Sequence, residues 1–143
     1  MITIVDYGMG NLRSVQKAFE AVGASAHVTQ EPNAVEKSSK LVLPGVGAFQ
    51  DAKKNLETLR LIEPILSAIR RGTPFLGLCL GLQLLFTESE EGGTGGTHPG
   101  FNLIPGRVRR FPANDLKVPH IGWNQIEYQA SGPERSRRAS IEH

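Results

Sequence analysis

A single cysteine lies inside a glycine-flanked pentapeptide, Gly77-Leu78-Cys79-Leu80-Gly81. The spacing glycine-x-nucleophile-x-glycine is that of a nucleophile elbow, where a strand turns sharply into a helix and exposes the nucleophile. A buried strand is expected over Pro74–Leu78, and the apolar run Leu82–Phe86 follows the pentapeptide, so Cys79 is expected at the junction of a strand and a helix. Cys79 would then have a strained backbone at a helix N-terminus, where free amides favour the thiolate. This pattern makes Cys79 a candidate nucleophile for acyl transfer.

Attack of a thiolate on a carboxamide also requires N–H donors for the oxyanion. The N–H of Leu80, directly after the cysteine, is one such donor. A second could come from Pro44-Gly45-Val46-Gly47, a glycine-bearing turn that follows an apolar strand expected over Lys40–Leu43. Because parallel strands bring their carboxyl ends to one edge of the sheet, this turn and Cys79 are expected at the same edge.

The N-terminal half reads as alternating strands and helices. Strands are expected over Ile2–Val5 and Ser25–Thr29. Between them, Asn11 can cap a helix whose apolar stripe runs along one face to Val22 and which Gly23 ends. A second amphipathic helix is expected from Leu61 to Ile69, with Pro64 in its first turn and Gly72 after its end. Strand, helix and strand in this order predict a parallel α/β sheet.

Length and composition restrict the class of protein. The chain has 143 residues, 39% of them hydrophobic, which suits one buried core. A formal charge of +2 without a basic stripe argues against a nucleic-acid binder. No apolar run approaches the ~20 residues of a membrane span, and a signal peptide is not recognisable. With one cysteine and no internal disulfide, we expect a cytoplasmic protein. A dinucleotide fingerprint at Gly8–Arg13 fails, because Arg13 replaces its third glycine.

The C-terminal half is less regular. The glycine-rich segment Glu88–Gly100 is expected to form a surface loop. Loose alternation over Ile104–Phe111 and Trp123–Tyr128 suggests an antiparallel strand pair. Residues 130–143 have no apolar period and suggest a disordered tail that diverges from the domain formed by residues 1–129.

Five stretches in order carry a resemblance to the class I glutamine amidotransferase family, and within it to the glutaminase subunits of imidazole glycerol phosphate synthase. They are Asp6–Leu12, Pro44–Phe49, Gly77–Phe86, Glu88–Glu91 and Pro119–Asn124. The resemblance implies a three-layer, flavodoxin-like α/β fold with a mostly parallel sheet flanked by helices. It also implies hydrolysis of glutamine to glutamate and ammonia through a cysteine thioester. In this family the ammonia passes to a (β/α)₈ cyclase subunit within a heterodimer of histidine biosynthesis.

The resemblance implies site residues by motif position. Cys79 is the nucleophile, and Gly47 and Leu80 supply the oxyanion amides, with a flip of the peptide at Val46. Gln83 and Glu91 hold the glutamine. Asn11 and Trp123 lie toward the cyclase subunit, and no metal or organic cofactor is implied.

The family completes its catalytic triad with a histidine and a glutamate in a His-Pro-Glu stretch, which this sequence does not contain. We therefore expect an incomplete domain that lacks the family's C-terminal strands and closing helix and is catalytically deficient. His27, His98 and His120 belong to other contexts, and Glu142-His143 has the reverse order without the proline. Three alternatives stay open: a non-catalytic protein that docks on the cyclase subunit, a fragment without function, and the glutaminase of another class I amidotransferase.

Overall fold

The structure is a computed structural model that describes residues 1–91, 96–111, 118, 122–123 and 125. It divides into two units, Met1–Arg110 and Phe111–His143, and the helices and strands formed by the described residues lie in the first. The strands are β1 (Ile2–Val5), β2 (Ala26–Thr29), β3 (Leu41–Leu43), β4 (Phe75–Gly77), β5 (Phe86–Ser89), β6 (His98–Pro99) and β7 (Ile104–Val108). The helices are α1 (Leu12–Ala21), α2 (Pro32–Glu36), α3 (Phe49–Thr58), α4 (Ile62–Arg70) and α5 (Leu80–Gln83).

The main sheet has four parallel strands in the order β2-β1-β3-β4. Ile4 of β1 pairs with Val28 on one side and with Val42 on the other, so the N-terminal strand lies inside the sheet. Strand β3 pairs in turn with β4, from Leu41 opposite Phe75 to Leu43 opposite Gly77. The carboxyl ends of β3 and β4 therefore lie side by side, which confirms the predicted parallel sheet and brings the two candidate motifs to one edge.

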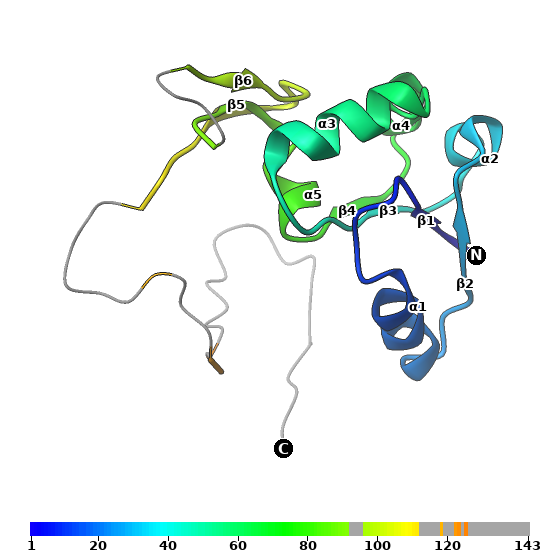
Figure 1. The fold of residues 1–143 in the computed structure, drawn as a ribbon. Coiled ribbons are helices and arrows are strands. Elements are labelled where there is room, and N and C mark those ends of the chain that lie inside the picture. Colours follow the sequence, from blue (N-terminus) through cyan, green and yellow to red (C-terminus); the bar gives the residue numbers. More distant parts are fainter. Residues whose placement is uncertain (92–95, 112–117, 119–121, 124, 126–143) are drawn as a thin grey trace, which may run out of the picture. The chain divides into compact units, whose positions relative to one another are not determined.

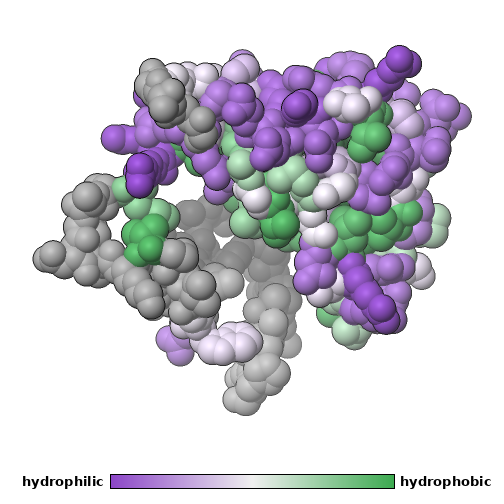
Figure 2. Space-filling view, viewed as in Figure 1, coloured by the Kyte–Doolittle hydropathy of each residue, from purple (hydrophilic) through white to green (hydrophobic). Residues whose placement is uncertain are grey.

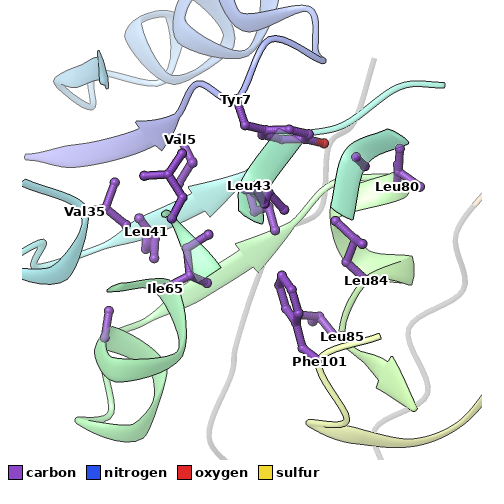
Figure 3. Close-up of a cluster of buried hydrophobic side chains, with 14 of the residues drawn as sticks. Val5, Tyr7, Val35, Leu41, Leu43, Ile65, Leu80, Leu84, Leu85 and Phe101 are labelled. Atoms are coloured by element: carbon purple, nitrogen blue, oxygen red, sulfur yellow. The ribbon is translucent and has the colours of Figure 1, made fainter. Parts of the chain in front are cut away.

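Apolar side chains alternate between the two faces of this sheet because successive residues of a strand point in opposite directions. On one face, Ile2, Ile4 and Val42 pack against the apolar stripe of α1. On the other face, Val5, Leu41 and Leu43 meet side chains of the remaining helices, and Figure 3 shows Val35, Ile65 and Leu80 in the same cluster. Figure 1 shows α1 on one side of the sheet and α3 and α4 on the other. The result is the expected three-layer arrangement.

The helices differ in part from the sequence-based expectation. Helix α1 has its predicted cap at Asn11, but Val22 at the end of the expected stripe is 78% exposed. Helices α2 and α3 were not predicted. Helix α3 buries Phe49, Ala52 and Leu56, a spacing of three and four residues that the polar residues between them obscure.

Strand β4 lies at the edge of the sheet that the described residues form, which corrects the expectation of a buried strand. It has a neighbour only at β3 among the described residues, and Leu76 at its centre is 45% exposed. The apolar run Pro74–Leu78 suggested burial on both faces, but hydropathy alone does not distinguish a central strand from an edge strand.

The region after the elbow also differs from expectation. Helix α5 (Leu80–Gln83) follows Cys79 directly, which confirms the predicted strand-to-helix junction, but it ends early and β5 begins at Phe86. Strand β5 forms a second sheet of order β6-β5-β7, antiparallel to β6 and parallel to β7. Glu88 and Ser89 therefore belong to a strand instead of the predicted loop.

Strand β7 confirms part of the strand predicted over Ile104–Phe111 but pairs with β5. Of the partner strand predicted over Trp123–Tyr128, Trp123 and Gln125 are described and are not in a strand. The rest of that segment, the tail of residues 130–143 and the domain boundary predicted at residue 129 lie outside the described residues.

The surface of the described residues is mixed in polarity. Figure 2 shows hydrophilic side chains over α3 and α4, with hydrophobic ones gathered in a band between these helices and α1. Within the described part of the chain, we find no helix with both the length and the apolar character needed to cross a membrane.

Candidate functional site

Cys79 occupies a strained position between β4 and α5. Its φ of +54° and ψ of −111° lie in a region that residues with a side chain rarely adopt, and the residue is exposed. A Cβ on Gly77 would come within 2.8 Å of the Gly81 carbonyl oxygen and of Leu82 backbone atoms. Both flanking glycines are thus required by close backbone contact, and the thiol is presented to solvent at the end of the edge strand.

The elbow is attached directly to β3. The N–H of Leu78 donates to the carbonyl oxygen of Leu43 at 3.0 Å. A Cβ on Gly81 would lie 1.8 Å from that same oxygen. Only glycine at position 81 lets the first turn of α5 approach the end of β3 so closely, and this contact fixes the position of Cys79 relative to the end of β3.

The turn Pro44–Gly47 adjoins the elbow, as the sequence predicts. A Cβ on Gly45 would lie 2.9 Å from Leu80 Cβ and 3.1 Å from the Gly81 nitrogen, so Gly45 fits directly against α5. Gly47 has a φ of +96°, and a Cβ there would lie 2.8 Å from the Met9 methyl carbon. The N–H groups of Gly47 and Leu80 find no acceptor among the described residues. Both predicted oxyanion donors are therefore available on adjoining segments.

The residues expected to hold glutamine lie around this turn. Val46 is 54% exposed at its tip. Gln83 is half-buried in α5, one turn after Cys79. The Glu91 carboxylate accepts a hydrogen bond from the Phe49 N–H at 3.3 Å, at the start of α3 and two residues after Gly47. The structure thus brings the second sheet and the turn together through Glu91.

Tyr7 is a member of this region that sequence reasoning missed. Its ring is 1% exposed, and its hydroxyl has no hydrogen-bond partner among the described residues. A Cβ on Gly45 would lie 2.3 Å from the Tyr7 hydroxyl oxygen. Burial, and secondarily the negative charge of the Cys79 thiolate, raise the pKa of Tyr7 to about 12. Tyr7 lies in the Asp6–Leu12 stretch of the resemblance, but the sequence does not show that it is buried beside the elbow, since three separate chain segments create its environment.

Other predicted residues lie elsewhere. The Asn11 side chain accepts a hydrogen bond from the Ser14 N–H at 3.3 Å and caps α1. Trp123 is fully exposed and belongs to the second unit. His27 lies in β2, with β1 and β3 between it and β4, and His98 lies in β6 of the second sheet. Within the described ranges, no cluster of three or more acidic, histidine or cysteine side chains could hold a metal ion.

Relatives of known identity resemble the chain over most of its length. It is 60% identical over 139 residues to the imidazole glycerol phosphate synthase subunit HisH of Syntrophotalea carbinolica, an alignment that covers 93% of this chain and 66% of that protein. It is 54% identical over 138 residues to the HisH subunit of Geobacter sulfurreducens, with 92% and 65% covered. The chain spans about two thirds of the length of these relatives.

The fold is shared with a solved structure described as a crystal structure of glutamine amidotransferase. The TM-score is 0.62 at 20% identity, and the match covers 77% of this chain and 57% of that one. A family model described as glutamine amidotransferase class-I matches residues 3–136. The chain therefore belongs to the class-I glutamine amidotransferase family.

Proposed function

We propose that the chain is the glutaminase part of an imidazole glycerol phosphate synthase and acts in histidine biosynthesis. One observation carries the proposal: the exposed Cys79 stands at a strained elbow beside two backbone amides that have no acceptor among the described residues. The class-I glutamine amidotransferase family supports glutamine as the substrate, and the names of the related HisH subunits support the synthase. A cysteine with this setting is suited to attack an unactivated carboxamide.

The reaction follows from these groups. The thiolate of Cys79 forms a bond to the side-chain carboxamide carbon of glutamine, and the carbonyl oxygen becomes an oxyanion. The N–H groups of Gly47 and Leu80 donate to this oxygen. Collapse of the intermediate breaks the C–N bond, and the nitrogen leaves as ammonia after taking up a proton. Water then hydrolyses the thioester, which gives glutamate and restores the thiol.

We assign substrate binding to Val46, Gln83 and Glu91. Val46 and Glu91 flank the Gly47 turn, and Gln83 lies on the helix that follows the nucleophile. A flip of the peptide at Val46 would aim the Gly47 N–H at the oxyanion. This flip costs little at Gly47, since glycine populates both signs of φ.

The partner in this proposal is the cyclase subunit, which receives the ammonia and completes the lyase-type synthase reaction. Subunit names of the relatives imply such a heterodimer. We place Asn11 and the fully exposed Trp123 at its interface. A cytoplasmic location, where a single free thiol stays reduced, belongs to the same proposal.

We further propose that a polypeptide of these 143 residues turns glutamine over slowly. Neither of the described histidines, His27 and His98, forms a hydrogen bond with Cys79 or lies on the strand next to it. Loss of the general base in a nucleophile–base pair lowers kcat by a factor on the order of 10⁴ to 10⁶.

Glutamate release in the presence of the cyclase subunit and its ligand tests the proposal. We expect slow release that depends on Cys79 and disappears in Cys79→Ser. Equal release by the Ser variant would contradict the role of the thiol. Release of glutamate at ordinary enzyme rates by the 143-residue chain would contradict only the proposal that this chain turns glutamine over slowly.

A second candidate function, a non-catalytic protein that docks on the cyclase subunit, is favoured by the complete exposure of Trp123. Large aromatic side chains in this state are frequent anchors of protein interfaces. This function requires cyclase binding that Trp123→Ala weakens and Cys79→Ser leaves unchanged, with no Cys79-dependent glutamate release.

A further inference from the structure

We propose that Tyr7 is a positioning residue of the glutaminase site whose hydroxyl donates a hydrogen bond to the Cys79 thiolate when the thiol ionises. The inference rests on the proposed function in that it takes Cys79 as the nucleophile. It adds a group from the end of β1 that stabilises the reactive form of the sulfur from the buried side of the elbow.

The first ground is an unused donor. The Tyr7 hydroxyl oxygen is fully buried and has no partner among the described residues, although buried hydroxyl groups are nearly always hydrogen-bonded. Tyr7 is 1% exposed. An unpaired O–H in this position calls for an acceptor that forms in another state of the site.

The second ground is position. The hydroxyl oxygen lies against Gly45, where an added Cβ would be only 2.3 Å away. The same added Cβ would lie 2.9 Å from Leu80 Cβ and 3.1 Å from the Gly81 nitrogen, the two residues that follow Cys79. The Tyr7 hydroxyl and the first residues of α5 therefore meet around the same point beside Gly45. Figure 3 shows the ring of Tyr7 with its oxygen directed to the side of Leu80.

The third ground is the change in the sulfur on ionisation. A neutral thiol is a weak acceptor, whereas an anionic acceptor strengthens a hydrogen bond, so a bond from the Tyr7 hydroxyl is expected to form only when Cys79 ionises. The charge of a Cys79 thiolate acts on Tyr7, because it contributes to raising the pKa of the phenol. With that pKa at about 12, Tyr7 keeps its proton at neutral pH and can only donate. Cys79 is exposed and forms no disulfide, so its thiol is available as the acceptor.

The test is the pH dependence of Cys79 alkylation by iodoacetamide, in which the thiolate displaces iodide and forms a carbon–sulfur bond. Cys79 is the only cysteine of the chain, so intact mass reports this one reaction. Tyr7→Phe removes only the oxygen. Because a hydrogen bond to a charged group is lost, the midpoint of the rate profile should rise by about one pH unit, and alkylation below the midpoint should slow about tenfold.

Ser38→Ala is the matched control, since Ser38 also carries a buried hydroxyl without a described partner and precedes β3 at the opposite end of that strand. It should leave the midpoint unchanged. An unchanged midpoint in Tyr7→Phe, or an equal rise in Ser38→Ala, would overturn the proposal, because a purely structural role of Tyr7 moves stability and not the thiol profile.

A measurement without substitution covers the case of an unfolded variant. Tyrosine labelled with ¹³C at Cζ gives two signals, since the chain has two tyrosines, and Tyr7→Phe assigns them. If that variant is lost, the smaller change in alkaline titration identifies Tyr7 by its raised pKa. The ¹³C chemical shift of Tyr7 should change at the pH of the alkylation midpoint. A chemical shift that stays constant through that pH would overturn the proposal. Glutamate release and its loss in Cys79→Ser report the proposed function separately.

Discussion

The contact between Gly81 and the end of β3 allows a direct test of how the elbow is held. In Gly81→Ala, the new Cβ would lie 1.8 Å from the Leu43 carbonyl oxygen, 2.8 Å from the Leu43 carbonyl carbon and 3.3 Å from its Cγ. Two of these atoms belong to the backbone of a strand inside the sheet, so no side-chain rotation relieves the overlap. Helix α5 and β3 would have to separate by about 1.2 Å to restore a distance of even 3.0 Å.

The energetic cost has two parts. Overpacking of a well-packed interior typically costs about 1–3 kcal/mol. The same Leu43 oxygen accepts the hydrogen bond from the Leu78 N–H at 3.0 Å, and moving the elbow would weaken this bond at a cost of about 1 kcal/mol. We therefore expect the free energy of unfolding to fall by roughly 2–4 kcal/mol, a large part of the 5–15 kcal/mol of an ordinary domain.

Urea unfolding followed by far-ultraviolet circular dichroism measures this loss. Gly96→Ala is the control, since a Cβ there would meet no heavy atom within 4 Å and its φ is not positive. The control should stay within about 0.5 kcal/mol of the unsubstituted chain. If Gly81→Ala is equally stable, the elbow is not packed on β3 as described, and the close approach that positions Cys79 is wrong.

Three further expectations concern the surroundings of the site. Asn11→Ala should lower the free energy of unfolding by about 1 kcal/mol in urea titrations, because the cap of α1 is lost, and an unchanged value would argue against the cap. Gly45→Ala should lower the free energy of unfolding, and adding Tyr7→Phe should recover part of that loss because it removes the oxygen 2.3 Å from the new Cβ. Strictly additive changes in the free energy of unfolding in this double-mutant cycle would contradict the contact. The pKa of Tyr7 is raised from 10.0 in the unfolded chain to about 12 in the folded one, so the protonated phenol stabilises the fold fully below pH 10 and this stabilisation is lost as the pH rises through 12. Unfolding curves at alkaline pH should therefore show a loss of about 2–3 kcal/mol in the free energy of unfolding, and Tyr7→Phe should not show it.

The sequence was sufficient to predict the parts of the fold that local patterns specify. The β-branched run Ile2–Val5, the cap at Asn11 and the parallel order of the first strands follow from residue spacing and connection type. The elbow was predictable because glycines at positions 77 and 81 mark a backbone that tolerates no Cβ. These features depend on neighbours in the chain.

Features that depend on distant segments were not predictable in the same way. The edge position of β4 follows from which strands are present beside it, and Leu76 looks like a core residue until that is known. Strand β5 replaced the start of an expected loop because its pairing with β6 and β7 outweighed the glycine-rich composition that follows it. The burial of Tyr7 likewise arises where the end of β1, the Gly45 turn and α5 meet.

The most direct measurement is covalent capture of Cys79 by a chloroketone analogue of glutamine, followed by intact mass and peptide mapping. The account predicts one adduct per chain at Cys79, formed faster than on a free cysteine and slowed by added glutamine. Modification no faster than that of free cysteine and insensitive to glutamine would contradict a nucleophile that recognises a carboxamide substrate.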